Sequence, residues 1–308
     1  MNQKETKRAE NMDSEKTQSH YNEITSWEDK DLNLKDKLLR GIYSYGFEKP
    51  SSIQKKAVMP FIYGVNGKRK DIIAQAQSGT GKTGAFVVGS LQLMDEKNKD
   101  TQVLILAPTH ELARQIKNVV DNLGNYLNIT SILLVGGTSV DENRKQIEKK
   151  KPQFVVGTPG RVHDMIRRNI LDVSKLDLLV LDEADEMLSS GFKEQMGNIL
   201  QYMPENLQIG LFSATLNEDL MEVAKTFMRT PIKILVKNEE LTLQGIAQYY
   251  VNLNDDSEKY DTLKDIFSTL TISQSIIYCN STRRVDDLEE AMLEDEFPVK
   301  KIHGKMTE

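Results

Sequence analysis

The sequence predicts an α/β protein in which helices cover both faces of a parallel sheet, followed by the first part of a second unit of the same kind. Two observations predict this fold class. From about residue 70, short runs rich in Val, Ile and Leu alternate with longer amphipathic segments, and the alternation resumes near residue 239. The small-residue segment Ala76–Thr83 follows the first apolar run and precedes a helical pattern, which is where α/β proteins carry a phosphate-binding loop.

Short apolar runs mark the strands of the first unit. They are too short for helices and apolar throughout, as expected for strands buried on both faces. The runs are Asp71–Ala74, Val103–Ala107, Ile132–Val135, Phe154–Val156, Leu178–Leu181 and Ile209–Phe212. Between the second and third, apolar residues recur three or four apart from Leu112 to Leu123, which predicts an amphipathic helix with Gly124 as its C-cap.

The second unit is predicted to contain three strands and two helices. The strands are Ile246–Val251, Ser275–Cys279 and Val299–His303, and the helices surround Leu263–Leu270 and Val285–Met292. We expect Cys279 to be a buried strand cysteine. Three strands are few for an independent α/β domain, so we expect the chain to be a C-terminally truncated fragment.

We therefore expect a disordered polar tail over residues 1–25, a first domain over 26–237 and a partial second domain over 238–308, with Val236–Leu243 as the linker.

Composition excludes several classes of protein. The 308 residues carry a net charge of −6, which argues against a generic basic polyanion binder, so any nucleic-acid site must be a local patch. A single cysteine excludes an intrachain disulfide framework. No apolar stretch approaches the roughly 18 residues of a membrane helix, and no apolar run follows the first charges as in a signal peptide. We expect a cytoplasmic protein, with a nuclear location also open.

The loop Ala76–Thr83 predicts an ATP site. The amides of Ser78, Gly79, Thr80 and Gly81 can converge on phosphate oxygens, and Lys82 can reach the outer phosphates. Thr83 can place its hydroxyl on Mg²⁺. The strict pattern begins with Gly, where this chain has Ala76. The alternative is an ordinary Gly-rich turn before a helix.

An acidic pair ends the fifth apolar run. Asp182 and Glu183 follow Leu181, and carboxylates at the C-terminal end of a parallel strand face the edge where α/β proteins bind ligands. Asp182 is a candidate Mg²⁺ ligand and Glu183 a candidate for polarising the attacking water. The alternative is a solvated acidic helix start.

These motifs together resemble the DEAD-box RNA helicases. The resemblance rests on Asp-Glu-Ala-Asp at 182–185, the phosphate loop, and Ser213-Ala214-Thr215 at a strand end. Three runs are similar to the translation initiation factor 4A subfamily: LLRGIYSYGFEKPSSIQ (Leu38–Gln54), DEADEMLSSGF (Asp182–Phe192) and LTLQGIAQYYV (Leu241–Val251). The resemblance implies two RecA-like lobes of a P-loop NTPase, with ATP and RNA bound between them.

The resemblance also assigns residues at the nucleotide site. Gln54 matches the glutamine that reads adenine, with Lys49 just ahead of it, and Trp27 is the candidate for an upstream aromatic. A solvated helix glutamine is the alternative for Gln54. Ser213 and Thr215 match the motif that couples the ATP and RNA sites; the alternative is two hydroxyls that bind strand-end amides.

Several loops match RNA-contacting motifs of the family. The matching residues are Pro108, Thr109, Gly136, Gly137, Thr158, Pro159, Gly160 and Arg161 in the first unit, and Asn280 and Gly304 in the second. Such groups bind phosphate and ribose without reading sequence; singly, each is equally a tight turn. His110 stands where the family has Arg. We interpret the basic runs Lys68–Lys70, Lys149–Lys151 and Arg283–Arg284 as solvated.

The resemblance implies an ATP-dependent RNA helicase in translation initiation or mRNA metabolism, a monomer acting on single-stranded or short duplex RNA with scaffold or initiation-factor proteins as partners. Arginine-bearing motifs that complete the family's ATP site are not found in the sequence. A catalytically incomplete ATP- and RNA-binding fragment is therefore the alternative. A protein-remodelling or DNA-directed ATPase is a third possibility that the phosphate loop alone leaves open.

Overall fold

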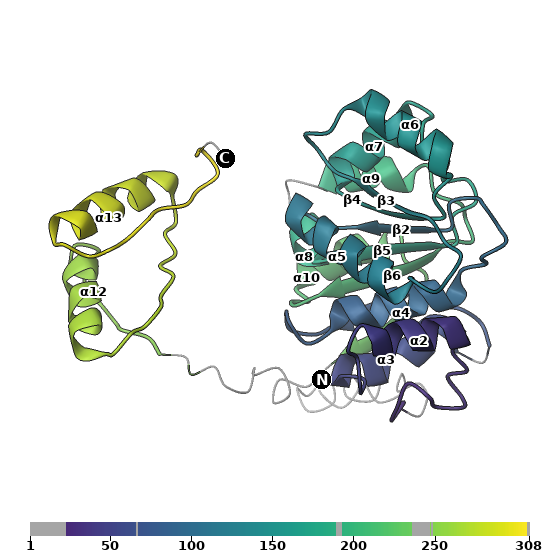
Figure 1. Ribbon diagram of the computed structural model, residues 1–308, viewed down its shortest axis with the longest axis horizontal. Helices are drawn as coiled ribbons and strands as arrows, with labels where there is room; N and C mark the ends of the chain where they lie inside the picture. Colours follow the sequence, from purple (N-terminus) through teal and green to yellow (C-terminus); the bar gives the residue numbers. More distant parts are fainter. Residues whose placement is uncertain (1–22, 66, 189–192, 236–246, 248, 307–308) are drawn as a thin grey trace, which may run out of the picture. The chain divides into compact units, whose positions relative to one another are not determined.

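A computed structural model describes residues 23–65, 67–188, 193–235, 247 and 249–306 of the chain (Figure 1). The chain divides into two compact units, Met1–Gln244 and Gly245–Glu308. The expected domain boundary at residues 237/238 and the linker Val236–Leu243 fall almost wholly outside the described residues. Each unit is described by itself below.

The first unit is built on a seven-stranded sheet in the order β3-β4-β2-β5-β6-β1-β7. Every neighbouring pair of strands is parallel, and the predicted fold class is confirmed. The strands are β1 (Ile72–Gln75), β2 (Val103–Leu106), β3 (Ser131–Leu134), β4 (Phe154–Gly157), β5 (Leu178–Asp182), β6 (Gln208–Ser213) and β7 (Ile232–Leu235).

Strand β7 was not predicted. It pairs with β1 alone and forms one end of the sheet, so its side chains alternate between buried and exposed. Ile232 and Ile234 are buried, while Lys233 and Leu235 are exposed. A four-residue edge strand therefore lacks the continuous apolar run by which the six other strands were predicted.

Helices cover both faces of the sheet, as Figure 1 shows. They are α2 (Asp36–Ser44), α3 (Ser52–Tyr63), α4 (Lys82–Leu93), α5 (His110–Leu123), α6 (Val140–Lys150), α7 (Pro159–Arg167), α8 (Ala184–Met187), α9 (Lys193–Leu200) and α10 (Glu218–Lys225). Helix α5 ends at Gly124, as predicted, and begins at Thr109, whose hydroxyl accepts a hydrogen bond from the Leu112 amide (3.2 Å).

Two hydrophobic clusters fill the space between the sheet and its helices. In one cluster, the helices from α2 through α5 pack on one face of the sheet, which contributes Val103 and Ile105 of β2. In the other cluster, the helices from α6 through α10 pack on the opposite face, which contributes Leu104 and Leu106 of the same strand. Alternate residues of one strand thus enter different cores, which is why the central strands are apolar throughout.

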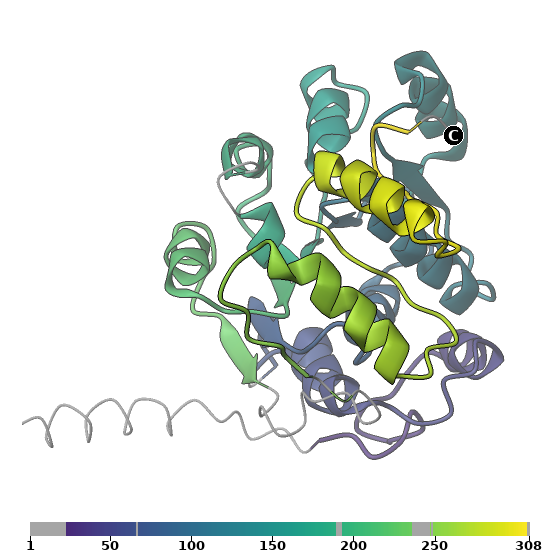
Figure 2. The same ribbon diagram turned by 90° about the vertical axis from the view of Figure 1, so that its left-hand side faces the viewer.

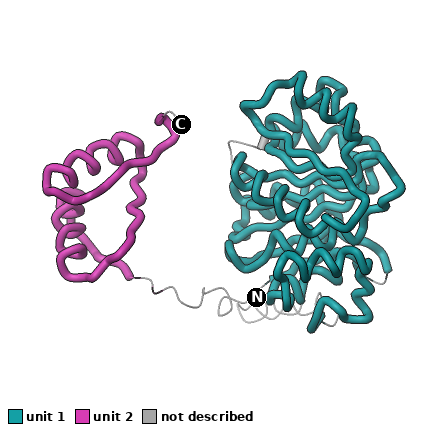
Figure 3. Tube along the Cα trace, viewed as in Figure 1, with its two compact units in different colours: residues 1–244 teal, residues 245–308 magenta. Residues whose placement is uncertain are grey.

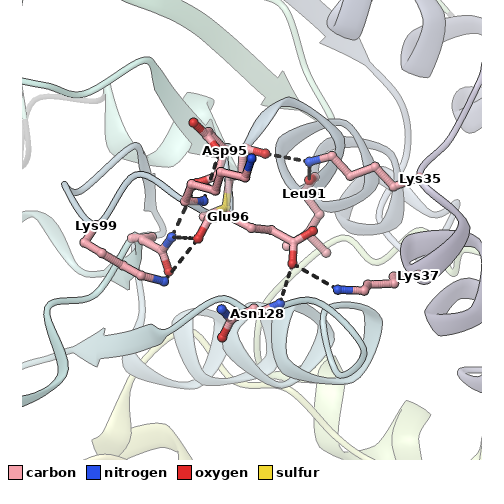
Figure 4. A network of polar contacts seen from close by, with 10 residues as sticks. Lys35, Lys37, Leu91, Asp95, Glu96, Lys99 and Asn128 are labelled. Atoms are coloured by element: carbon pink, nitrogen blue, oxygen red, sulfur yellow. Dashed lines mark hydrogen bonds and ion pairs between the residues drawn. The ribbon is translucent and has the colours of Figure 1, made fainter.

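A polar network fastens helix α2 to the ends of α4 and α5 (Figure 4). Lys35 donates from Nζ to the carbonyl oxygens of Leu91 (3.1 Å) and Met94, so it caps the C-terminal end of α4 with a cation. Burial lowers the pKa of Lys35. Glu96 in turn accepts a hydrogen bond from the Asn128 amide (2.7 Å).

The N-terminal boundary differs from the expected one. Residues 1–22 lie outside the described residues, but Ile24, which we had assigned to the polar tail, is buried and donates its amide to the Lys55 carbonyl (3.2 Å). The packed chain therefore begins before residue 25. Of the helices that the structure describes, none has the length and apolar character to cross a membrane.

The second unit contains α12 (Glu258–Thr269) and α13 (Thr282–Glu294), which lie side by side in Figure 2. Tyr260 donates its hydroxyl to the Ala291 carbonyl (2.8 Å), and Phe267 packs on Phe297 with ring centroids 5.8 Å apart. Of the hydrophobic residues described in this unit, Met292 is the one fully buried. Figure 3 draws the unit in magenta.

The predicted strands of this unit are wrong where the structure describes them. Ser275–Cys279 and Val299–His303 are not paired as strands, nor are residues 249–251; the rest of Ile246–Val251 is mostly outside the described residues. Ile276 is 79 % exposed, and Cys279 is half-exposed instead of buried. A parallel strand needs a neighbour to pair with, and the described residues of this unit supply none.

Candidate functional site

The carboxyl-terminal edge of the sheet collects the strand-end motifs of the first unit. Because all the strands are parallel, the loops that follow them emerge at one edge. Neighbouring strands β5, β6 and β1 bring together Asp182, Ser213 and the phosphate loop. Neighbouring strands β3, β4 and β2 bring together the loops that begin near Gly136, Thr158 and Pro108. We call the part of the edge that carries the predicted ATP-site residues the nucleotide half and the part that carries the predicted RNA-contacting loops the RNA half; the two meet where β5 pairs with β2.

The phosphate loop fills the space between β1, which ends at Gln75, and α4, which begins at Lys82. Gly79 and Gly81 have φ values of +79° and +101°, in the left-handed region that favours glycine. The Thr80 hydroxyl donates to the Gln77 carbonyl (2.6 Å) and tightens the turn. The loop ends at the N-terminus of a twelve-residue helix, whose free amides and dipole favour a bound anion.

Lys82 and Glu183 form the ion pair that joins the two predicted halves of the ATP site. Lys82 Nζ lies 3.2 Å from Glu183 Oε1, although the residues are 101 positions apart. The Lys82 side chain is only 5 % exposed. The lysine is therefore already directed at the acidic motif, with its amine held by the carboxylate that we expected to act on water.

Asp182 is buried beside this pair. One of its oxygens accepts the Glu183 amide (3.1 Å), and burial raises the pKa of Asp182 to about 7, against the lowering effect of Lys82. Glu183 itself has φ +48°, a left-handed conformation that costs about 1–3 kcal/mol for a residue with a side chain. Strain of this kind often occurs at functional sites, and here it coincides with the residue that the sequence motif predicts to act on water.

The residues present fit a Mg²⁺ ion. A buried carboxylate whose pKa is raised is stabilised by a nearby cation, and Asp182 supplies this group. Thr83 follows Lys82 directly and adds a hydroxyl oxygen. Within the described ranges no group of three or more His, Cys, Asp or Glu residues forms a metal cage, which suits an ion that keeps most of its water and binds phosphate oxygens.

Gln54 connects helix α3 to the phosphate loop. Its Oε1 accepts the Ser51 amide (2.8 Å) and its Nε2 donates to the Gly81 carbonyl (3.1 Å). The carboxamide still has one N–H and one lone pair for a base. A Cβ on Gly81 would lie 2.8 Å from Gln54 Nε2, so the contact requires glycine there. Lys49, which precedes Gln54 in the sequence, is exposed.

Trp27, the candidate for the family's upstream aromatic, is part of the core. Its side chain is only 1 % exposed and stacks on Phe47, with ring centroids 6.4 Å apart. The ring packs in the cluster that also contains residues of α2 and α3. Its match to the upstream aromatic of the family stays a prediction.

Ser213 and Thr215 link the phosphate loop to the acidic motif. The Ser213 carbonyl accepts the Ala76 amide (3.1 Å), and the Thr215 hydroxyl donates to Asp185 Oδ2 (2.6 Å). Burial alone would raise the pKa of Asp185, but hydrogen bonds from Thr215 and Ser213 hold it below its ordinary value. From the sequence, Asp185 was named only as part of the motif. Its hydrogen bond with Thr215 shows that it holds the residue after β6 in position.

The RNA half is built from strand-to-helix junctions. Pro108 is buried and Thr109 is exposed at the start of α5, while Thr158 and Pro159 begin α7. His110, in the place of the family's Arg, lies against the next loop: a Cβ on Gly136 would be 3.0 Å from His110 Nε2. The neighbouring Gly137 (φ +78°) and Gly160 leave backbone exposed at this edge.

Arg161 holds two of these loops together. Its guanidinium donates to the hydroxyl (2.9 Å) and the carbonyl (2.7 Å) of Thr138, and to Asn143 Oδ1. The loop after β4 is thereby fastened to the loop after β3. Sequence reasoning missed both partners. The sequence signal that could have indicated these contacts is Asn143, a neutral polar residue that is buried in α6, where most of the other residues are charged.

The second-unit candidates, Asn280 and Gly304, are both exposed. Asn280 precedes α13, whose first turn is capped by Ser281. The basic pair beside them is ion-paired, since Arg284 lies 2.6 Å from an oxygen of Asp256. RNA contact by Asn280 and Gly304 stays a prediction.

Comparison with known proteins agrees with this architecture. The DEAD/DEAH box helicase family matches residues 51–223. The chain is 48 % identical over 289 residues to eukaryotic initiation factor 4A of Caenorhabditis elegans, covering 94 % of this chain and 70 % of that one. It is 50 % identical over 277 residues to the ATP-dependent RNA helicase FAL1 of Saccharomyces cerevisiae, covering 89 % and 68 %.

Solved structures give the same result. S. cerevisiae Dbp5 bound to RNA and ADP BeF3 matches with a TM-score of 0.79 and 32 % identity, covering 92 % of this chain and 70 % of that one. A DEAD box protein from Methanococcus jannaschii matches with a TM-score of 0.65 and 32 % identity, covering 92 % and 74 %. The chain belongs to the DEAD/DEAH box helicase family and, within it, to the initiation factor 4A subfamily.

Proposed function

We propose that this chain is an ATP-dependent RNA helicase that binds ATP with Mg²⁺ at the nucleotide half and RNA at the RNA half of one sheet edge. Hydrolysis would be coupled to binding and local unwinding of short duplexes, in translation initiation or mRNA metabolism. Relatives named eIF4A and FAL1 and a Dbp5 structure bound to RNA and ADP BeF3 support this assignment. We further propose a monomer that works in the cytoplasm with initiation-factor or scaffold proteins.

The Lys82–Glu183 ion pair of 3.2 Å is the observation that carries the proposal. Phosphate oxygens bound by the loop amides would attract the Lys82 amine and release Glu183. The freed carboxylate is then available to orient water and accept its proton. Asp182 and Thr83 would hold Mg²⁺, which neutralises phosphate charge when bound.

The RNA half offers backbone and hydroxyl groups in place of base-reading side chains. Exposed amides near Gly137 and Gly160 and the hydroxyl of Thr109 suit phosphate and ribose contacts. Arg161 fixes the spacing of two of the loops through Thr138. Thr215 and Asp185 connect the acidic motif to the end of β6, so they are candidates for transmitting the state of one half to the other.

Replacing Lys82 with Ala tests the nucleotide site. A charged hydrogen bond is worth about 1.5–3 kcal/mol, so affinity for a fluorescent ATP analogue should fall roughly tenfold to a hundredfold. Lys145→Ala, an exposed lysine on α6, is the matched control and should bind as the unmodified chain does. Unchanged affinity in the Lys82 variant would sink the proposal.

RNA-stimulated ATPase activity tests the reaction. Turnover that rises with single-stranded RNA but not with DNA of the same sequence supports the helicase and excludes a DNA-directed or protein-remodelling ATPase. A chain that binds ATP and RNA without hydrolysing ATP is the second candidate function, because the second unit has so few buried residues among those described. Tight binding of RNA in the presence of a nonhydrolysable ATP analogue, with no turnover, would favour it.

A further inference from the structure

A basic pocket lies at the amino-terminal edge of the sheet, opposite the phosphate loop. Its volume is about 330 Å³, and it is lined by Lys68–Asp71, Asn206–Gln208 and Arg229–Thr230. These segments lead into β1, β6 and β7, which are neighbours in the sheet. Strand β1 therefore has a predicted phosphate site at one end and this pocket at the other.

Lys68 and Arg69 are exposed and Lys70 is partly exposed, in line with our interpretation of this run as solvated, and its backbone is fixed at the start of the sheet. Val65 and Lys68 exchange two backbone hydrogen bonds (2.9 and 3.0 Å) in a tight turn. Gly64 makes the turn possible: it has φ +65°, and a Cβ there would lie 1.8 Å from the Lys68 carbonyl oxygen. The turn delivers the three cations to the start of β1.

Four cationic side chains line this pocket: Lys68, Arg69, Lys70 and Arg229. Among the described residues, no carboxylate lies within ion-pair distance of Lys68 or Lys70, and Arg69 has only a long contact of 3.9 Å with Asp177. The Arg229 guanidinium is committed to backbone carbonyls. The Lys70 amine donates to the Thr230 hydroxyl (3.3 Å) and keeps its other N–H groups, so the two lysine amines are the cationic groups open to a ligand.

Asp71, the acidic lining residue, lies close enough to Lys70 and Arg229 to interact with their charges, so it offsets part of the positive charge of the four cations. It is 2 % exposed, and its two oxygens accept the backbone amides of Ile209 (2.8 Å) and Arg229. Its role is to join the starts of β1, β6 and β7. The pocket keeps an excess of positive charge.

Gln208 adds an unused acceptor to the lining. It is 4 % exposed, and its Nε2 donates to the carbonyl oxygens of Phe61 (3.0 Å) and Lys70 (2.8 Å). Because both N–H groups are used, the amide orientation is fixed. Its Oε1 has no hydrogen-bond partner among the described residues and no exposed surface, so Gln208 fixes the wall of the pocket and leaves ligand binding to the cations.

We propose that this pocket binds a small phosphoryl anion, such as hydrogen phosphate or pyrophosphate. Lys68 and Lys70 would bind the ionised oxygens, with the Thr230 hydroxyl beside the Lys70 amine. A phosphodiester in an RNA strand carries one negative charge, whereas hydrogen phosphate and pyrophosphate carry more than one, so the phosphodiester matches this basic lining less well. The occupant is free phosphate or pyrophosphate.

Calorimetric titration of the full chain with pyrophosphate at physiological ionic strength tests the proposal. Every variant also carries Lys82→Ala, so that binding of pyrophosphate at the phosphate loop does not contribute to the measured heat. Adding Lys68→Ala and Lys70→Ala should weaken binding at least roughly tenfold, since each removes a charged hydrogen bond. Adding Lys149→Ala and Lys150→Ala, an exposed basic pair on α6, should leave it unchanged.

Amide NMR of the same background locates the site independently. Pyrophosphate should shift the Lys70, Gln208 and Thr230 resonances and leave Asn143, on the other edge, in place. Equal affinity with and without Lys68 and Lys70, or no binding at millimolar pyrophosphate, overturns the proposal. So does full competition by an RNA oligonucleotide lacking terminal phosphates, which would identify a phosphodiester site. None of these outcomes depends on ATP binding by the phosphate loop.

Discussion

Replacing Asp182 with Asn tests the electrostatics of the nucleotide half without any ligand. Asn has the same size but does not titrate. Burial raises the pKa of Asp182 from 3.8 to about 7, so the folded chain binds the proton more tightly than the unfolded chain. This contribution to stability is complete below about pH 4 and is lost as the pH rises towards 7.

The expected magnitude follows from this pKa. Between pH 5 and 7 the unfolded Asp182 has lost its proton while the folded one largely keeps it. Each pH unit in that window lowers the free energy of unfolding by about 1.4 kcal/mol, so the chain loses about 2–3 kcal/mol relative to the Asn variant. From pH 5 to pH 7, the free energy of unfolding of the Asn variant should therefore rise by this amount relative to that of the unmodified chain.

Urea unfolding at pH 5, 6, 7 and 8 measures the difference. Trp27, the single tryptophan, is buried in the first unit, so its fluorescence follows the unit that contains Asp182. Asp100→Asn, at an exposed carboxylate, serves as the control. A difference between Asp182→Asn and the unmodified chain that stays constant across these pH values would refute the reasoning.

Three further substitutions have defined outcomes. Lys35→Met removes the cation that caps α4 and should lower the free energy of unfolding in urea by about 1–2 kcal/mol. Gly81→Ala puts a Cβ 2.7 Å from Ser51 Oγ and should cut affinity for a fluorescent ATP analogue more than Gly79→Ala, where no atom lies within 4 Å. Arg161→Lys breaks its fork of hydrogen bonds and should lower RNA affinity in fluorescence anisotropy roughly tenfold, with ATP affinity unchanged.

Each of these has a matched control. Lys37→Met, at a side chain that is 59 % exposed, should cost less than Lys35→Met, and equal costs would contradict the capping role. Equal losses for Gly81→Ala and Gly79→Ala would mean that backbone strain alone matters. Arg144→Lys on α6 should leave RNA binding intact. A similar loss in both arginine variants would point to bulk charge.

Sequence reasoning predicted the central sheet because interior parallel strands are apolar on both faces, as in Leu178–Asp182. The same rule missed β7, an edge strand that alternates. In the second unit it predicted strands such as Ser275–Cys279 from composition, but strand pairing depends on neighbours, and apolar composition alone does not provide them. The helix end at Gly124 was predicted from local capping chemistry, whereas the N-cap at Thr109 was not.

The residues of the candidate site that directly follow strands were predictable from the sequence. Lys82 and Glu183 were named from motifs, and parallel strands bring such residues to one edge. The contacts of Arg161 with Thr138 and Asn143 were not predictable, because they depend on the order β3-β4-β2, which the sequence does not encode locally. The burial of Trp27 was not predictable either, because an aromatic residue near a motif has the same local sequence pattern whether it is buried or exposed.

The double contact of Gln54 couples two segments that are far apart in the sequence. One carboxamide touches both the Ser51 amide and the Gly81 carbonyl, so any displacement of this side chain disturbs the start of α3 and the last residue before α4 together. A change at either segment is therefore transmitted to the other through a single side chain.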